Sequence, residues 1–200
     1  MQLTIPDGDF SGYIFDCDGT LIDSMPAHFR AWDRALRELG SGAPLPEDLF
    51  YSLGGVPTRR VAQLLLAHFS LAADPLELFH RKEAIFVSML GEVALLEPVV
   101  AFARAVAKSH PVSVASGGPR EVVLRSLELC GLLPLFPVII TADDVEHGKP
   151  APDMFLLAAE RMRVEPARCL VFEDAEPGIQ AAAAAGMQCV RVPSRITTRL

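Results

Sequence analysis

The chain has 200 residues, of which half are hydrophobic and 22% are charged, and its formal net charge is −7. This composition supports one domain with an insertion, or two small domains, and it excludes a largely disordered chain. Because no run of basic residues is longer than Arg59-Arg60, we expect no nucleic-acid partner.

The chain shows no signal for export or for a membrane. Its first residues contain no basic segment followed by an apolar one, and no apolar stretch reaches the length of a membrane span. Its four cysteines form no C-x-x-C pair. We therefore expect a reduced cytoplasmic protein with no membrane partner, as a monomer or a weak homo-oligomer.

Five short apolar runs rich in β-branched residues predict strands, at residues 12–18, 111–116, 137–141, 169–174 and 189–193. Stretches of helical period separate the last four, beginning near Pro119, Asp153 and Ile179, and the last ends at Gly186. Strand-helix-strand repeats of this kind predict a Rossmann-like, doubly wound α/β fold with a parallel sheet covered on both faces.

Residues 24–91 depart from this pattern. Apolar residues at helical spacing predict helices over 25–39, from about residue 58, and from Pro75 to about residue 90, with residues 40–48 read as a loop. Asp74 and Glu77 predict a capping box at the third helix. We expect a helical cap at 24–91 inserted into a core of 1–23 and 92–200, over the carboxyl ends of the strands.

Carboxylates follow two of the predicted strands. Asp16 and Asp18 lie at the end of the first, and Glu173 and Asp174 end the fourth. Since parallel strands end at one edge of the sheet, these groups should meet there, where unpaired charges would be costly. Such a cluster suits a hard divalent cation, and Mg²⁺ fits best because it takes few protein oxygens.

Position then suggests roles for the two aspartates. Asp16, at the strand end, can attack phosphorus as a nucleophile. Asp18, in the following turn, can protonate the leaving oxygen and then activate water. Asp-Gly after a strand is also a common turn, so this motif alone does not establish catalysis.

The second and third strands add groups that suit an anion. Ser116 and the amides of Gly117 and Gly118, at a predicted helix start, would form a cradle for phosphate, and Lys149 would neutralise its charge. Taken singly, Ser116 could be a helix cap and Lys149 a surface lysine. Their common position at one sheet edge favours the functional interpretation.

The motifs "FDCDGT", "VASGG", "GKPAPDMF" and "VFEDAEPGIQAAAAAGM" resemble those of the haloacid dehalogenase-like phosphohydrolase superfamily, over nearly the whole chain. The stretch "DSMPAHFRAW" is similar to the β-phosphoglucomutase-like branch. The resemblance implies strand order 5-4-1-2-3 and Mg²⁺-dependent phosphoryl transfer. It also implies Mg²⁺ bound by Asp16, the Asp18 carbonyl and Asp174, assisted by Glu173, and phosphate bound by Ser116 and Lys149.

The same resemblance implies substrate-binding residues in the cap. His28 and Lys82 match a histidine and a lysine of the β-phosphoglucomutases, whereas Thr58 stands where those enzymes have an arginine, with Arg59 next to it. This departure weakens the mutase interpretation. The stretches "PTRRVAQ" and "KPAPDMFLLAAERM" look more like those of bacterial sugar-phosphate phosphatases, which implies a phosphoric monoester hydrolase acting on a small phosphorylated metabolite such as fructose 1-phosphate or 6-phosphogluconate. The alternatives are a phosphosugar mutase, which is an intramolecular phosphotransferase, and a non-catalytic phospho-ligand binder. The binder would be expected to have lost Asp16 or Asp18.

Overall fold

The computed structural model describes residues 3–54 and 56–193, which form two compact units. The helical unit comprises Ser24–Val93. The sheet unit comprises the described residues up to Asp23 and from Ala94 onward.

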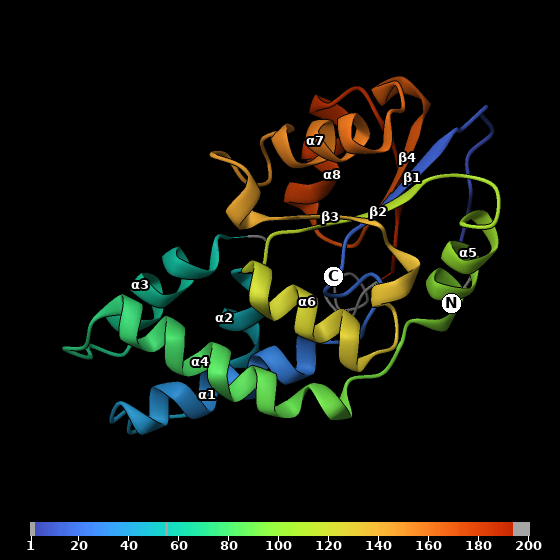
Figure 1. Cartoon of the computed structure of the whole chain (residues 1–200). Coiled ribbons are helices and arrows are strands. Elements are labelled where there is room, and N and C mark those ends of the chain that lie inside the picture. Colours follow the sequence, from blue (N-terminus) through green and yellow to red (C-terminus); the bar gives the residue numbers. More distant parts are fainter. Residues whose placement is uncertain (1–2, 55, 194–200) are drawn as a thin grey trace. The chain divides into compact units, whose positions relative to one another are not determined.

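The sheet unit is built on a parallel sheet of five strands, which confirms the predicted α/β fold (Figure 1). The strands are β1 (Gly12–Phe15), β2 (Val112–Ser116), β3 (Val138–Thr141), β4 (Cys169–Glu173) and β5 (Gln188–Arg191). Their spatial order is β3-β2-β1-β4-β5, as predicted. Every residue of β2 and β4 is buried, because both strands lie inside the sheet with helices on its faces.

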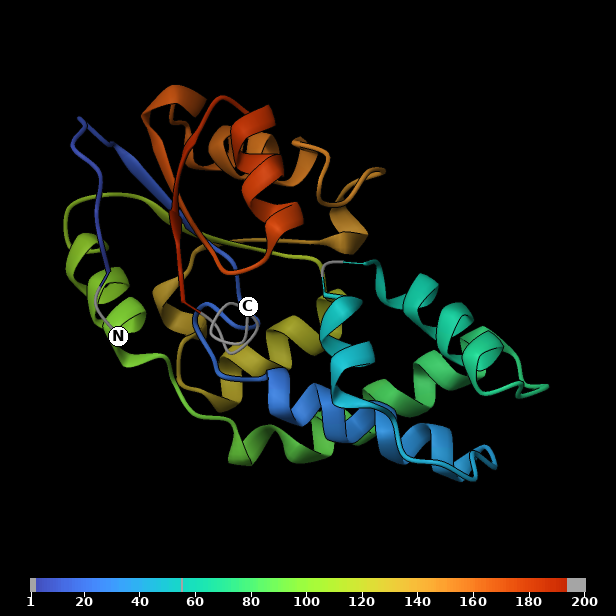
Figure 2. The ribbon, with the colours of Figure 1, turned by 180° about the vertical axis from the view of Figure 1, so that it is seen from behind.

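Two pairs of helices cover the two faces of this sheet (Figures 1 and 2). On one face lie α7 (Asp153–Met162) and α8 (Glu176–Ala184), whose apolar residues share a buried cluster with Ile14 and Val171. On the other lie α5 (Glu97–Val106) and α6 (Arg120–Leu129). The 3₁₀ turns η2 (Leu133–Leu135), η3 (Ala142–Asp144) and η4 (Pro166–Arg168) join these elements.

A stack of aromatic rings fills the face covered by α5. Phe15 of β1 and Phe172 of β4 are direct neighbours across the sheet, and their ring centroids are 4.8 Å apart. Phe102 of α5 packs on Phe172 at 4.9 Å. Because successive side chains of a strand point to opposite faces, the next residues, Asp16 and Glu173, point to the face covered by α7 and α8, at the carboxyl edge.

The helical unit contains one more α-helix than predicted among its described residues. Its helices are α1 (Met25–Glu38), α2 (Glu47–Ser52), α3 (Thr58–His68) and α4 (Pro75–Met89), followed by the 3₁₀ turn η1 (Leu90–Glu92). The short α2 begins directly after Pro46, at the end of a stretch whose glycines and prolines indicate a loop. Buried Phe50 holds it by packing against Phe29 of α1, a tertiary contact that local sequence does not reveal.

The start of α4 confirms one predicted cap and corrects another. Asp74 accepts a hydrogen bond from the Leu76 amide at 3.0 Å, as an N-cap should. Glu77 does not complete a capping box; its carboxylate pairs with Arg81 one turn later, at 2.9 Å. The charged partner competes successfully for the Glu77 side chain.

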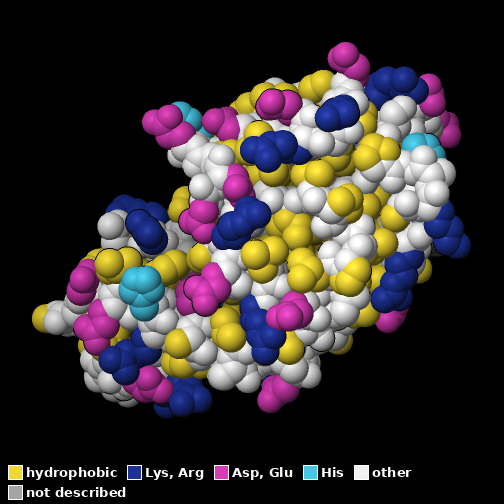
Figure 3. Space-filling model, viewed as in Figure 1, with side chains coloured by type: hydrophobic (Ala, Val, Ile, Leu, Met, Phe, Trp, Pro, Cys, Tyr) yellow, Lys and Arg dark blue, Asp and Glu magenta, His cyan; other side chains and the backbone are white. Residues whose placement is uncertain are grey.

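Acidic and basic side chains are interspersed over the face shown in Figure 3. Several form pairs along one helix, such as Arg34 with Glu38 and Arg37 with Asp33. Of the helices in the described part of the chain, none has both the length and the hydrophobicity that a membrane span requires.

Replacing Phe172 by alanine should lower the free energy of unfolding by about 3–5 kcal/mol, because it removes a fully buried ring at the centre of the aromatic stack. Urea unfolding followed by circular dichroism measures this. Leu129→Ala, at a side chain 45% exposed, is the control and should cost far less. Equal losses in the two variants would contradict the importance of the stack.

Candidate active site

Three buried carboxylates converge where β1 and β4 end. Asp16 follows β1, Glu173 ends β4 and Asp174 comes next, and one oxygen of each lies within 4.8 Å of the others. The Asp16 amide donates to the Phe172 carbonyl at 3.0 Å, so the pairing of the two strands continues into the site. The parallel register therefore places these acids side by side.

Lys149 lies among these carboxylates. Its Nζ donates to Asp16 Oδ1 and to Glu173 Oε2, each at 2.7 Å, and to the Ala115 carbonyl at 3.0 Å. Only 11% of its side chain is exposed. The alternative of a solvated surface lysine is thus excluded.

The electrostatics reflect this crowding. Burial raises the pKa of Asp16 well above its usual range, and the charge of Glu173 adds to the rise. Burial and the same neighbour raise the pKa of Asp174 to about 7. Burial by itself would lower the pKa of Lys149, but the attraction of Asp16 and Glu173 is stronger and raises it overall.

This donor set fits a divalent cation. When Asp16, Glu173 and Asp174 are ionised, Lys149 balances one of the three negative charges, and two remain in a buried space. Carboxylate oxygens are the ligands that Mg²⁺ prefers, and two uncompensated negative charges match its charge. The residues present therefore fit the predicted ion.

Glu173 is held more tightly than the other two acids. Its Oε1 accepts from the amides of Asp174 (3.2 Å) and Ala175 (3.0 Å), and its Oε2 accepts from Lys149. A Cβ added to Gly178, in α8, would overlap the Glu173 carboxylate. Glu173 thus serves best as an anchor for Lys149, which leaves Asp16 and Asp174 as the better candidates for direct metal ligands.

Asp18 lies in the turn after β1 and is half-buried. The turn is closed by a hydrogen bond from the Gly19 amide to the Ile22 carbonyl at 2.8 Å. Gly19 has a φ of +86°, and a Cβ there would lie 2.7 Å from Asp174 Cγ. Asp18 is one of the charges that raise the Asp174 pKa, but its carboxylate is outside the group of three.

The loop after β2 corrects one detail of the predicted phosphate cradle. Ser116 is 1% exposed, and its Oγ accepts from the Gly118 amide at 3.2 Å, so that amide is engaged within the loop. Helix α6 begins later, at Arg120, whose amide donates to Asp143. Ser116 and the exposed Gly117 thus lie together at the end of β2, whereas the Gly118 amide is already paired and the helix starts three residues after Gly117.

Two predicted substrate residues of the helical unit lie around one aromatic ring. His28 stacks on Phe86 with ring centroids 3.7 Å apart. Lys82 is 3% exposed, bonds to Glu83 Oε1 at 3.0 Å, and lies over the rings of Phe86 and Trp32. Lys82 is thus a buried, paired cation.

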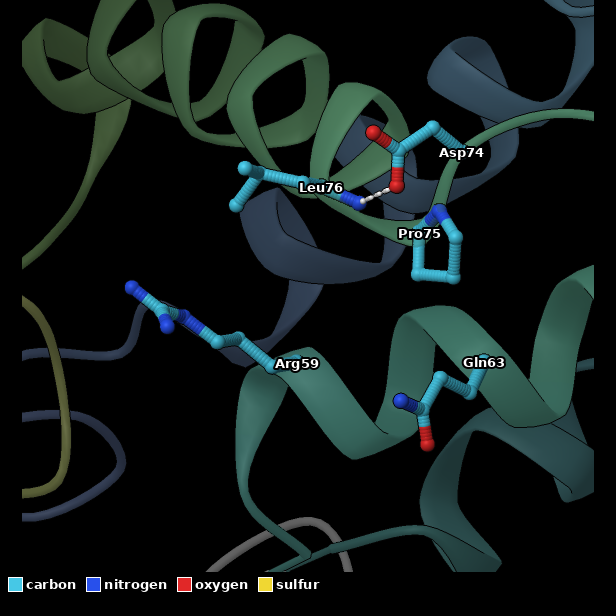
Figure 4. Close-up of a pocket in the computed structure, with 5 residues that line it drawn as sticks. All are labelled: Arg59, Gln63, Asp74, Pro75 and Leu76. Carbon is cyan, nitrogen blue, oxygen red and sulfur yellow. Dashed lines mark hydrogen bonds between the residues drawn. The ribbon is translucent and has the colours of Figure 1, made fainter.

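The third predicted residue, Arg59, lines an open pocket of about 290 Å³ within the helical unit (Figure 4). The pocket lies between α3 and the start of α4 and is lined by Arg59, Gln63, Asp74, Pro75 and Leu76. The Arg59 guanidinium lies over the Phe79 ring, with 5.7 Å from Cζ to the centroid. Arg59 is exposed, in contrast to Lys82.

Three contributors to the site were missed from the sequence. Thr20 Oγ1 donates to Asp174 Oδ1 at 3.4 Å, the Ala115 carbonyl accepts from Lys149, and Gly178 makes room for Glu173. Only Gly178 had a recognisable signal, because glycine inside a helix is unfavourable without a packing reason.

Comparison with known proteins identifies the family. Residues 10–186 match the model of the haloacid dehalogenase-like hydrolases, and the chain belongs to this family. The chain is 40% identical to fructose-1-phosphate phosphatase YqaB of Escherichia coli (strain K12), over 92% of this chain and 96% of that protein. It is 33% identical to a phosphorylated carbohydrates phosphatase of Thermotoga maritima, over 88% and 81%.

A solved structure supports the fold. The chain matches a β-phosphoglucomutase from Clostridium difficile with a TM-score of 0.81 and 23% identity, covering 95% of this chain and 87% of that one. The family model and the two relatives confirm the predicted family. The chain is a hydrolase of this family, and the names of its relatives agree with the predicted class of phosphoric monoester hydrolase.

Gly178→Ala should impair the site although alanine favours helices. The intrinsic gain of about 1 kcal/mol in a helix is outweighed by overlap with the Glu173 carboxylate, which must then move away from Lys149. We expect a lower melting temperature and a large loss of activity. Gly91→Ala, where a Cβ meets nothing within 4 Å, is the control. A more stable, fully active G178A protein would contradict the packing argument.

Mg²⁺ should raise the melting temperature more at about pH 8 than at about pH 5. In the metal-free protein the pKa of Asp174 is about 7, above the usual value of about 4. The folded state therefore binds this proton more tightly than the unfolded state does, and protonation of Asp174 stabilises the fold. That contribution is lost as pH rises through 7, where a cation can take the place of the proton. Thermal scans with and without Mg²⁺ test this.

Asp174→Asn is the matched variant and should respond weakly to Mg²⁺ at both pH values, because it lacks one of the two carboxylates that would bind the ion directly. An equal Mg²⁺ response of the wild-type protein at both pH values would argue against the site.

Proposed function

We propose that this protein is a Mg²⁺-dependent phosphatase that hydrolyses small sugar phosphates through an aspartyl-phosphate on Asp16. The observation that carries the proposal is the group formed by Asp16, Glu173, Asp174 and Lys149 at the strand ends. Bound Mg²⁺ would offset the charge of the carboxylates and of the incoming phosphate.

Asp16 is proposed as the nucleophile. Its carboxylate is fixed by the strand end on one side and by Lys149 on the other, so little motion is needed before attack. Attack on phosphorus forms the bond to Asp16 and breaks the bond to the sugar oxygen. Lys149, 2.7 Å from Asp16, would stabilise the negative charge of the phosphoryl group.

Asp18 is proposed as the acid and base. It would give its proton to the leaving sugar oxygen, and then take a proton from the water that attacks the phosphoenzyme, which returns Asp16 and releases phosphate. Ser116 and Gly117 would bind the phosphoryl oxygens during both steps. Asp18 lies on a turn held by Gly19 and Ile22, and its carboxylate is outside the group of three acids.

Substrate choice rests on the relatives. Fructose-1-phosphate phosphatase YqaB and the Thermotoga maritima enzyme are named for phosphorylated sugars, which supports a compound of that class as the substrate here. We propose that exposed Arg59 and half-buried His28 of the helical unit contribute to recognising the sugar, and that buried Lys82 contributes through the Phe86 ring on which His28 stacks. The enzyme would act on a phosphorylated metabolite in the cytoplasm.

The test is a Mg²⁺-dependent assay with fructose 1-phosphate, 6-phosphogluconate and β-glucose 1-phosphate, in which free phosphate and glucose 6-phosphate are followed in parallel. Release of phosphate with little glucose 6-phosphate supports the phosphatase. Formation of glucose 6-phosphate faster than phosphate, with a bisphosphate primer, would establish the mutase instead.

Asp16→Asn should reduce turnover to background while the circular dichroism spectrum stays unchanged, because an amide cannot form the phosphoenzyme.

Asp18→Asn should slow release of the sugar and hydrolysis of the phosphoenzyme by about 10²–10⁴-fold, the usual contribution of general acid–base catalysis. Asp9→Asn, at an exposed carboxylate paired with Arg168, is the control and should leave turnover unchanged. Phosphate release by the D16N protein at the wild-type rate would refute the nucleophile assignment.

A further inference from the structure

The loop of residues 116–119, which carries the proposed phosphate-binding groups, is tied to the segment that follows β3. The Gly118 carbonyl accepts from the Ala142 amide at 3.2 Å. The Arg120 amide, directly after the loop, donates to Asp143 Oδ2 at 2.7 Å. The loop is therefore held at two points by the turn η3.

That turn is itself anchored to the sheet. Asp144 Oδ2 accepts from the Thr141 amide at 2.8 Å and from Thr141 Oγ1 at 2.7 Å, and Thr141 is fully buried at the end of β3. The Arg120 guanidinium reaches the same carboxylate, with Nη1 2.9 Å from Oδ2 and 3.1 Å from Oδ1. Since Thr141 pairs in register with Ser116, the anchor lies directly beside the loop.

The position of Asp143 matters for where a phosphate can bind. The N-terminus of a helix attracts anions through its unpaired amides, and both a carboxylate and a phosphate can satisfy them. In α6 the Asp143 carboxylate already occupies the first amide, that of Arg120. That amide is therefore not available to a substrate phosphate, which in the proposed function is bound by Ser116, Gly117 and Lys149.

We infer that Asp143 is a positioning residue that holds the loop 116–119 in the geometry that binds the phosphoryl group, an inference that rests on the proposed function. Asp143 acts through the hydrogen bond to the Arg120 amide, and not through its charge. These two effects have opposite signs. Loss of the hydrogen bond loosens the loop and weakens phosphate binding, whereas loss of a negative charge near an anion site strengthens it.

Two substitutions separate the effects. Asp143→Ala removes both the acceptor and the charge, and Asp143→Asn removes the charge but keeps an oxygen that can accept from Arg120. Glu128→Ala, which breaks an exposed pair with Arg125 on the same helix, is the matched control. The measurements are kcat and KM with fructose 1-phosphate, the Kd of inorganic phosphate with Mg²⁺ by calorimetry, and the melting temperature.

The D143A protein should show KM and phosphate Kd raised by about fivefold, the effect expected when one net hydrogen bond that orders the loop is lost, with kcat within about twofold of wild type. The D143N protein should bind phosphate at least as tightly as wild type, and E128A should match wild type. Unchanged KM and Kd in D143A, or a tighter Kd in both D143A and D143N, would overturn the inference. So would a lower melting temperature in D143A with no change in KM or Kd.

The same measurements distinguish failure of the positioning role from failure of the proposed function. A wild-type protein that neither hydrolyses the ester nor binds phosphate would overturn it, and the positioning role with it. An active wild-type protein with an unaffected D143A variant would overturn the positioning role alone.

Discussion

The ammonium of Lys149 lies within 2.7 Å of both Asp16 and Glu173, in a place where burial alone would drive carboxylates to take up protons. A buried charge needs a partner, and removing one member of such a group leaves the others uncompensated. The sheet supplies the acids from β1 and β4, while Lys149 arrives from a loop more than thirty residues after β2. Its three hydrogen bonds therefore join the ends of β1, β2 and β4 into one site.

Bringing these groups together leaves little room for the backbone around them. Two glycines allow the backbone to pass close to the carboxylates, each in a different way. Gly19 adopts a left-handed conformation and passes close to Asp174, while Gly178 lets α8 approach the Glu173 carboxylate. The loop after β2 is held by hydrogen bonds instead. Asp143 accepts from the Arg120 amide, and Asp144 accepts from the Arg120 guanidinium. The site is thus built from backbone geometry as much as from the acids themselves.

The helical unit has a mainly apolar interior that contains a buried ion pair. Its core is an aromatic and aliphatic interior, in which Trp32 is 3% exposed and Lys82 is buried with Glu83. The two ring faces beside Lys82 and the carboxylate of Glu83 compensate for its lost hydration. The sequence does not reveal that this ion pair is buried, because its burial depends on how α1 and α4 pack together.

The sequence by itself determined the five strands, the parallel α/β fold, and the residues at the strand ends. Apolar period and strand-helix alternation are local properties, and parallel strands necessarily bring their carboxyl ends to one edge. The tertiary structure alone decided which of those residues meet: Asp16, Glu173 and Asp174 with Lys149, and not the Asp18 carboxylate. It also decided the short helix α2 and the capping of α6 by Asp143, since each depends on a side chain distant in sequence. Such contacts are fixed by packing and by competition among partners, which no local pattern encodes.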